Sequence, residues 1–158
     1  MTEEDRIERL VCEYGRMLVR LAASRLDSVA DAEDAVQDVF CTLVSKKLVF
    51  VDPEYEKAWL IRATINRASD LRRRLNVPLD EARAVPDDAA ETERRGREML
   101  ACVRALPEKY AVVLHLHYYE GCGLREIGVM LRVPAATVGT RLARGRARLK
   151  ALLEEESL

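Results

Sequence analysis

The sequence predicts an all-α protein made of two small helical domains that a flexible linker joins. Apolar residues recur at helical spacing along most of the chain, and no stretch alternates apolar and polar residues as a half-buried strand would. The composition, 49% hydrophobic, 34% charged and only 5% aromatic, also favours a soluble helical protein. We expect one domain at residues 1–75, the linker at residues 76–94 and the second domain at residues 95–158.

The first domain is expected to contain three or four helices. Residues 4–26 form one or two amphipathic helices. Asp31 is expected to cap the next helix, which has acidic residues in its first turn and an apolar stripe up to Val44. The chain breaks at Pro53, where a long helix begins and continues to about Leu75.

The linker and the second domain follow from the positions of proline, glycine and charge. Residues 76–93 contain two prolines, many acids and no sustained apolar face, which is typical of an extended linker. Helical spacing resumes near Arg95, and a helix that starts at Pro107 is expected to end at Gly121. A short helix, a break and a second, basic helix then follow in the order of a helix-turn-helix unit.

Charge is distributed unevenly along a chain that is almost neutral overall. The sequence has 26 basic and 27 acidic side chains, yet residues 61–75 carry five basic and one acidic, and residues 124–150 carry seven basic and one acidic. A basic stripe on a helix is the electrostatic feature to look for in nucleic-acid binding. Both segments are therefore candidates for contact with DNA, and the alternative is that each is a solvated surface.

The last helix has the pattern of a helix that inserts into the major groove of DNA. Its buried side is expected to include Gly145, where a neighbouring helix could approach closely. Small residues occupy the opposite side and cations flank them, which suits a groove with two phosphate walls. The buried side consists of Val138, Leu142, Gly145 and Leu149; the small residues are Ala136, Thr140, Ala143 and Ala147; one flank carries Thr137, Arg141, Arg144 and Arg148, and the other carries Gly139, Arg146 and Lys150.

A second candidate surface lies on the helix that begins at Pro53. Its apolar stripe, which includes Ile61 and Ile65, is expected to face the core. Another face combines an aromatic ring, an amide and guanidinium groups, which can stack on unpaired bases and hold the backbone. Burial of Trp59 in the core is the alternative. The residues of this face are Trp59, Arg62, Asn66, Ser69 and Arg73.

The helix from Asp31 carries a polar stripe of a different kind. Asp34, Gln37, Asp38 and Cys41 lie next to its apolar residues. Carboxylates placed so closely together repel DNA and usually form a solvated face. If they have a partner, we expect it to be a basic protein surface.

Other classes of function are weakly supported. The acidic start "MTEEDRIERL" lacks the pattern of a signal peptide, and no apolar run approaches the roughly 18 residues of a membrane span, so we expect a cytoplasmic protein without direct membrane insertion. The four cysteines are scattered and are expected to be free thiols. His115 and His117 point about 160° apart on a helix, which argues against a shared metal ion. We therefore expect no catalytic residue, no metal and no cofactor, with a metal enzyme kept as an alternative.

Three segments, in this order, resemble the extracytoplasmic-function (ECF) sigma factors, the minimal group of the sigma-70 family of bacterial RNA polymerase subunits. "DAEDAVQDVF" is similar to the family's region 2.2, and "KAWLIRATINRASDLRRR" to regions 2.3–2.4. The segment that starts "LPEKYAVVLHLHYYEG" and ends "ARLKALL" is similar to region 4. The match covers nearly the whole chain outside the linker.

The resemblance implies a promoter-specificity subunit that binds core RNA polymerase, recognises the −35 and −10 promoter elements and helps to open the duplex. It implies contact with the polymerase's β′ clamp and β flap, passage of the linker near the active-site cleft, and inhibition by an anti-sigma factor. The implied residues are, for core polymerase, Asp34, Gln37 and Asp38; for the −10 element, Trp59, Arg62, Asn66, Arg67 and Arg73; and for the −35 element, Thr137, Thr140, Arg141, Arg144 and Arg148.

The chain departs from the family pattern around the helix-turn-helix unit. Arg132 stands where relatives often have glycine, Gly139 replaces a longer side chain, and Gly123-Leu124 replaces Ser-Tyr. These departures leave the −35 sequence preference open. Two rival functions also remain: a decoy that binds an anti-sigma factor but not promoter DNA, and an ordinary helix-turn-helix repressor.

Overall fold

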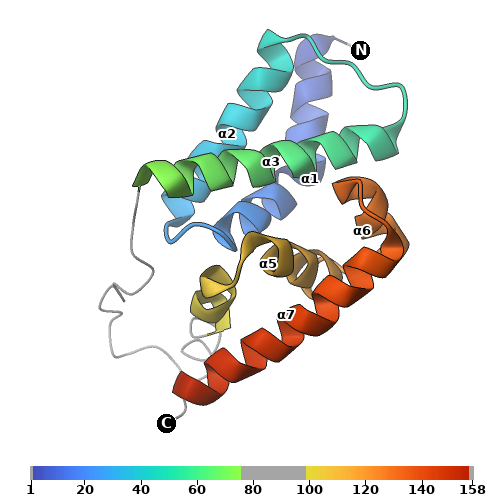
Figure 1. Ribbon diagram of the computed structural model, residues 1–158. Coiled ribbons are helices and arrows are strands. Elements are labelled where there is room, and N and C mark those ends of the chain that lie inside the picture. The colour runs from blue at the N-terminus through green and yellow to red at the C-terminus, as the bar shows by residue number, and fades with distance from the viewer. Residues whose placement is uncertain (1, 76–98, 157–158) are drawn as a thin grey trace.

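The computed structural model describes residues 2–75 and 99–156, where all regular secondary structure is helical (Figure 1). The all-α prediction is confirmed, and the predicted linker, residues 76–94, lies outside the described residues. Within the described part no helix is both long and apolar enough to span a bilayer. The elements are α1 (Glu3–Ala23), α2 (Val29–Ser45), α3 (Pro53–Leu75), α5 (Glu108–Leu114), the π-helical turn η1 (His115–Tyr119), α6 (Leu124–Leu131) and α7 (Ala135–Glu156), and residues 99–105 are also helical.

The first two helices begin where side chains bond their free amides. Thr2 and Asp5 form a capping box on α1, in which the Asp5 amide donates to Thr2 Oγ1 at 3.1 Å and the Thr2 amide donates to Asp5 Oδ2 at 3.2 Å. On α2 the cap is Ser28, whose Oγ accepts from the Asp31 amide at 3.3 Å. The expectation that Asp31 caps this helix is therefore wrong. Asp31 lies in the first turn, where its charge still favours the positive end of the helix.

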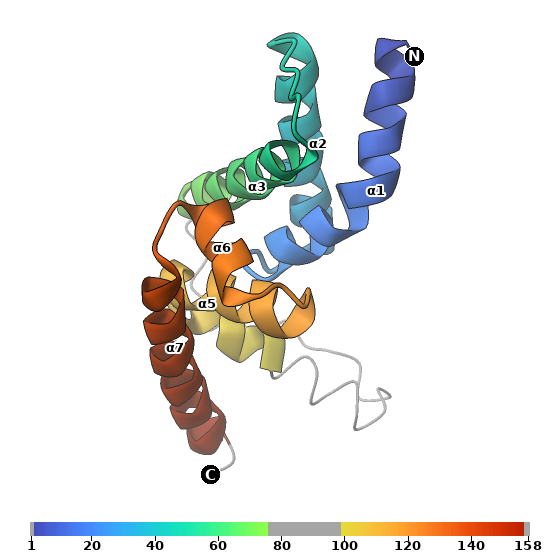
Figure 2. The ribbon, with the colours of Figure 1, turned by 90° about the vertical axis from the view of Figure 1, so that its right-hand side faces the viewer.

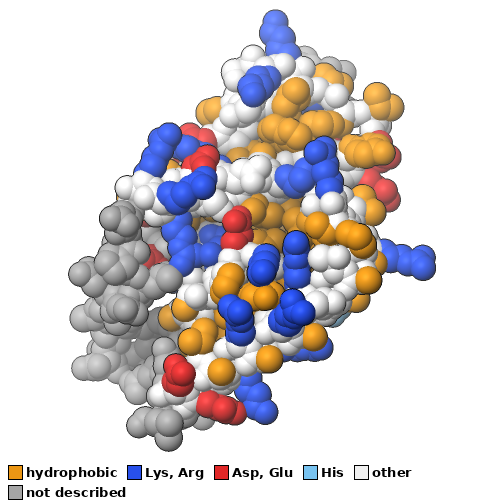
Figure 3. All heavy atoms as spheres, viewed as in Figure 1, with side chains coloured by type: hydrophobic (Ala, Val, Ile, Leu, Met, Phe, Trp, Pro, Cys, Tyr) orange, Lys and Arg blue, Asp and Glu red, His pale blue; other side chains and the backbone are white. Residues whose placement is uncertain are grey.

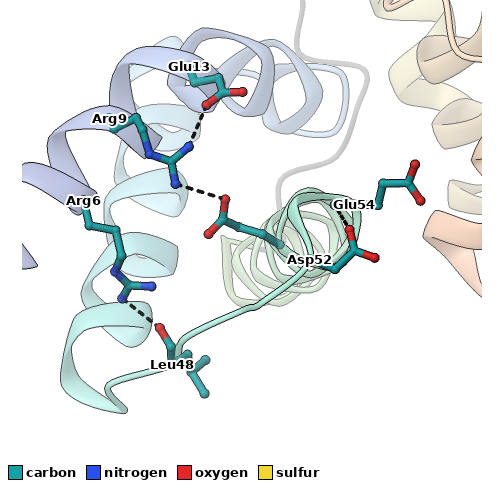
Figure 4. Close-up of polar contacts among 7 residues, drawn as sticks. Arg6, Arg9, Glu13, Leu48, Asp52 and Glu54 are labelled. Atoms are coloured by element: carbon teal, nitrogen blue, oxygen red, sulfur yellow. Dashed lines mark hydrogen bonds and ion pairs between the residues drawn. The ribbon is translucent and has the colours of Figure 1, made fainter. Parts of the chain in front are cut away.

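Two arginines of α1 hold the loop between α2 and α3, and the first turn of α3, against α1 (Figure 4). Arg6 Nη2 donates to the Leu48 carbonyl at 2.8 Å. Arg9 Nη2 lies 3.5 Å from Glu56 Oε1, which pairs this buried carboxylate with a cation. Asp52 Oδ1 accepts from the Glu54 amide at 2.9 Å and so satisfies one free donor in the first turn of α3.

The first domain is built around α3. α1 and α2 run in opposite directions and α3 crosses both (Figures 1 and 2). Full burial of one Leu or Ile side chain stabilises the fold by roughly 1.5–3 kcal/mol, so the shared apolar core between these helices holds the domain together. Its fully buried side chains include Leu10, Leu18, Leu21, Leu43, Leu60 and Ile61.

In the second domain, α7 packs across α5 and α6. Val138 and Leu142 are buried at this contact. A Cβ atom on Gly145 would lie 3.2 Å from both Leu114 Cδ1 and Tyr110 Cβ, so the predicted close approach at this glycine is confirmed.

The turn between α6 and α7 is tight. Arg132 ends α6 in the left-handed region, with φ 59° and ψ 44°, a conformation that costs a residue with a side chain about 1–2 kcal/mol. The Val133 amide then donates to the Gly128 carbonyl at 2.9 Å. Gly128 leaves room for this turn, because a Cβ atom on it would lie only 2.7 Å from the Val133 carbonyl oxygen.

The two domains pack directly against each other, with α6 in contact with α3 (Figures 1 and 2). One face of α3 therefore belongs to the core of the first domain, while another meets the helix-turn-helix unit. This placement brings the two predicted DNA-binding helices, α3 and α7, to the same side of the molecule.

Replacement of Gly128 by alanine tests the packing of this turn. A Cβ atom there must displace backbone, and forced overpacking of this kind costs about 1–3 kcal/mol, so Gly128→Ala should lower the free energy of unfolding by that amount. The measurement is urea unfolding followed by circular dichroism. The matched control is Gly139→Ala, where the added atom would lie 3.4 Å from Leu124 Cδ2, an ordinary contact, and helix propensity favours alanine by up to about 1 kcal/mol. Equal destabilisation by both variants would contradict the account.

Candidate nucleic-acid interface

The outer side of α7 forms a cationic pocket together with α5. The pocket has a volume of about 290 Å³ and is open to solvent. Four of the five residues predicted for the −35 element line it, whereas Arg148 stands beside it over the Tyr110 ring. The lining residues are Lys109, Tyr110, Ala136, Thr137, Thr140, Arg141 and Arg144.

Lys109 and Tyr110 are new members of this surface. Lys109 Nζ lies 5.1 Å and Arg148 Cζ 4.9 Å from the centroid of the Tyr110 ring, which is cation–π geometry. Burial raises the pKa of the Tyr110 phenol, but the neighbouring Lys109 and Arg148 outweigh burial and lower that pKa overall. A phenol whose anion is favoured reports a positive potential, which is what a phosphate-binding surface requires.

The centre of the outer side of α7 is accessible, as the wheel predicted. Ala136, Thr140, Ala143 and Ala147 are all exposed, so small side chains form a ridge that can approach base edges. Thr140 Oγ1 donates to the Ala136 carbonyl at 3.1 Å, which leaves its oxygen free to accept a further bond.

The other flank of α7 turns partly toward its own domain. Gly139, expected on a DNA-side flank, faces Leu124 of α6. Arg146 is exposed, but its Nη1 donates to the Tyr118 hydroxyl of η1. Arg146 and Lys150 are nevertheless exposed, so this flank also carries cations, but fewer than the flank next to Lys109.

The predicted −10 surface on α3 faces the second domain. Arg62 Nη1 donates to the Met130 carbonyl of α6 at 2.8 Å, and burial, together with the nearby Arg132, lowers the pKa of Arg62. Ser69 Oγ donates to Glu108 Oε1 at 2.6 Å. Asn66 is exposed, and Arg73 is exposed and hydrogen bonded to Asp70 on its own helix.

Trp59 is partly buried in the core of the first domain. Its side chain is half-buried and packs against the core, with its ring centroid 5.8 Å from that of Phe50. The rest of the side chain is partly accessible on the α3 surface. Phe50 therefore restrains the orientation of the Trp59 ring.

The acidic stripe of α2 is exposed and touches the predicted −10 surface at one point. Asp34, Gln37 and Asp38 are all exposed. Arg67 of α3 pairs with Asp38, its Nε and Nη2 atoms both lying 2.8 Å from Asp38 Oδ2. Two residues predicted for different partners, polymerase and DNA, therefore bind each other in the free chain.

Basic side chains over α3 and over α7 appear together in one view of the surface (Figure 3). The helical wheels of these two segments predicted one basic face on each helix. That the two faces point to the same side follows only from the packing of α6 on α3, which no periodicity within one helix reveals. Lys109 was missed for the same reason, since its partners lie on a different helix.

The histidines do not form a metal site. His117 Nδ1 lies 2.8 Å from the Cys122 carbonyl oxygen, while His115 Nε2 lies 3.5 Å from Glu120 Oε1. Among the described residues no group of three or more His, Cys, Asp or Glu side chains is arranged to hold a metal ion.

Comparison with known proteins accounts for both domains. The family description "Sigma-70 region 2" matches residues 10–77, and "Sigma-70, region 4" matches residues 96–149. The ECF RNA polymerase sigma factor SigM of Mycobacterium tuberculosis is 31% identical over 150 residues, which cover 92% of this chain and 76% of SigM. The chain belongs to the ECF sigma factors. Proteins of this family are transcription initiation factors and not enzymes.

Solved structures of sigma factors share the fold. CnrH, in complex with the cytosolic domain of CnrY, is 25% identical with a TM-score of 0.72, and the match covers 97% of this ECF sigma factor and 90% of CnrH. RpoE of Bartonella quintana, in complex with the anti-sigma factor NepR, is 17% identical with a TM-score of 0.68, covering 93% and 96% of the two chains. The second likeness is one of fold alone.

The burial of His115 predicts a pH-dependent stability. Burial lowers the pKa of His115; Glu120 opposes this effect and Arg20 adds to it. Because the unfolded chain binds this proton at a pH where the folded chain does not, the stabilisation is complete above the ordinary histidine pKa of about 6.5 and is lost as the pH falls below it. The free energy of unfolding should drop by at most about 1.4 kcal/mol per pH unit.

Urea unfolding of wild type and His115→Gln between about pH 7 and pH 5.5 measures this dependence. His115→Gln should flatten it, whereas the control His117→Gln should keep it. A slope that is the same in all three proteins would show that His115 does not cause it.

Proposed function

We propose that this sigma factor binds core RNA polymerase through α2, reads the −35 element with α7 and holds the −10 strand on α3. The observation that carries the proposal is the cationic pocket beside the exposed small-residue ridge of α7. A ridge of small side chains suits close approach to base edges, and cations beside it suit a phosphate wall.

At the −35 element, some side chains contact the bases and others position the helix on the phosphates. Thr137 and Thr140 offer hydroxyl groups near the ridge, where they can meet base edges. Arg141, Arg144 and Arg148 offer guanidinium groups for bases or phosphates. Lys109, whose helix is separate from α7, adds a phosphate contact and fixes how α7 enters the groove.

At the −10 element, α3 supplies a stacking ring and cations on one surface. Trp59 stacks on an unpaired base, Asn66 bonds a base edge, and Arg62, Arg67 and Arg73 hold the backbone. The Asp38–Arg67 pair must open for Arg67 to reach DNA. Binding of polymerase at Asp38 would release Arg67 at the same time.

The assignment of partners completes the proposal. Asp34, Gln37 and Asp38 bind the β′ clamp, and the second domain meets the β flap. The domains are residues 1–75 and 95–158, and residues 76–94 link them through the polymerase. An anti-sigma factor restrains the protein in the cytoplasm; the support is that RpoE, a sigma factor of similar fold, was solved with an anti-sigma factor.

Charge reversal on α2 separates polymerase binding from DNA binding. Asp34→Lys should weaken binding to core polymerase about tenfold, because it places a cation against a basic surface, while binding to −35 duplex DNA stays unchanged. Glu8→Lys is the matched control, since Glu8 is an exposed carboxylate on a different helix, α1. Co-elution with core polymerase and fluorescence anisotropy with DNA measure the two activities. Equal loss of polymerase binding in both variants would contradict the assigned stripe.

The salt dependence of duplex binding tests Lys109. Each phosphate that a side chain neutralises contributes about 0.9 to the slope of log K against log salt concentration. Lys109→Ala should reduce the slope by about that amount, and Arg141→Ala combined with Arg144→Ala should reduce both the slope and the affinity further. Lys46→Ala, an exposed lysine at the end of α2, should leave the slope unchanged. An unchanged slope in Lys109→Ala would remove Lys109 from the interface.

A further inference from the structure

The second domain covers part of the α3 surface that is proposed to hold the −10 strand. Met130, whose carbonyl accepts the hydrogen bond from Arg62 Nη1, belongs to α6 and is 4% exposed. Lys57 Nζ lies 3.3 Å from Glu126 Oε1 on the same helix. At Arg62, α6 thus occupies the space that a nucleic-acid backbone would need.

Arginines at the ends of helices hold this arrangement at a second place. Arg104 of the second domain donates through Nε to the Ala23 carbonyl at the end of α1, at 2.9 Å. In return, Arg72 Nη2 donates to the Arg104 carbonyl at 2.7 Å, and Arg25 Nη1 to the Leu106 carbonyl at 3.3 Å. The last carbonyls of a helix carry partial negative charge and lack helical partners, so these contacts satisfy both sides.

The burial of Arg25 indicates a specific interface between the two domains. Its side chain is buried, and burial, together with Arg72, lowers its pKa to about 10, so it stays charged near neutral pH. A buried cation is costly unless it is paired or hydrogen bonded. The partners of Arg25 are the Val103 and Leu106 carbonyls of the other domain, so separation of the domains would take them away.

An ion pair closes the interface at a third place. Arg20 of α1 bonds Glu120 at the end of η1 in a bidentate manner, with Nε–Oε1 at 2.8 Å and Nη2–Oε2 at 3.0 Å. The Glu120 side chain is only 6% exposed. Arg20 also lies over the Tyr119 ring, 5.8 Å from its centroid. None of these residues belongs to the proposed DNA or polymerase surfaces.

We infer that the free chain is closed on itself: its own second domain masks the part of the −10 surface of α3 around Arg62 and Ser69, and the domains must separate before the whole surface can bind single-stranded DNA. This inference rests on the proposed role of α3. While α6 holds Arg62 Nη1 on the Met130 carbonyl, the guanidinium is partly buried and fewer of its five N–H donors can reach a phosphate. The apparent dissociation constant for the strand equals the intrinsic one divided by the fraction of open molecules, so closure weakens binding without altering the binding residues.

A charge swap across the Arg20–Glu120 pair tests the inference in the full chain. Arg20→Glu and Glu120→Arg each place like charges together and should open the domains; the double variant restores an ion pair and should close them. Small-angle X-ray scattering reports opening, and fluorescence anisotropy with a mixed-sequence single-stranded oligonucleotide reports unmasking. Arg20→Glu should bind the oligonucleotide on the order of tenfold more tightly, although its added negative charge alone would weaken binding.

The outcomes are distinguishable. Masking is supported if the domains of both single variants open and these variants bind the oligonucleotide more tightly, and if the double variant reverses both effects. Opening without tighter binding overturns it, and so does the absence of opening. Arg62→Ala in the Arg20→Glu background should remove most of the gain, because Arg62 is the side chain that α6 covers; a gain that survives shows that α3 is not the surface unmasked. The polymerase and duplex assays above are independent of this result.

If a charge-swapped variant fails to fold, a covalent cross-link between the two domains tests the inference instead, because it keeps them closed. Lys57→Cys and Glu126→Cys, in a background in which the exposed Cys12 and Cys41 are serine, are joined by a cleavable bis-maleimide. The cross-linked protein should bind the oligonucleotide on the order of tenfold more weakly than the same protein after cleavage. Equal binding before and after cleavage would overturn the inference.

Discussion

The packing of α3 on two sides determines how the rest of the chain is arranged. Leu60 and Ile61 bury one side of the helix against α1 and α2. Arg62 bonds α6 from the other side. One helix therefore completes the core of the first domain and also receives the second. Its polar face is the part of the surface whose availability depends on the position of the two domains.

This arrangement relates the proposed binding surfaces to one another. The α7 pocket stays open in the closed chain, while Arg62 on α3 is engaged by α6 and Arg67 by Asp38. Duplex binding by α7 therefore needs no rearrangement, whereas strand binding by α3 needs two contacts to break. This difference suits a factor that opens DNA only after it has bound the polymerase. In the free chain, α3 then has little affinity for single-stranded DNA.

Much of the fold could be predicted because local chemistry decides it. Pro53 starts α3 and Gly121, with φ 74°, follows η1, as their backbone preferences require. Gly145 was identified as a packing position from its place on the wheel. The cap of α2 was misassigned because Ser28 and Asp31 both suit an N-cap, and only the observed helix start separates them. The role of Lys109 and the contact between the domains could not be predicted from the sequence. Both depend on contacts between different helices, and helical periodicity relates only residues within one helix.

The most direct test of the central claim is run-off transcription with purified core polymerase, this sigma factor and a library of promoter fragments. The account predicts discrete transcripts from a subset of fragments that share two spaced sequence elements, with none from core polymerase alone. A chain that binds core polymerase and duplex DNA yet yields no promoter-specific transcript would contradict the claim that its two helical surfaces act together in promoter recognition.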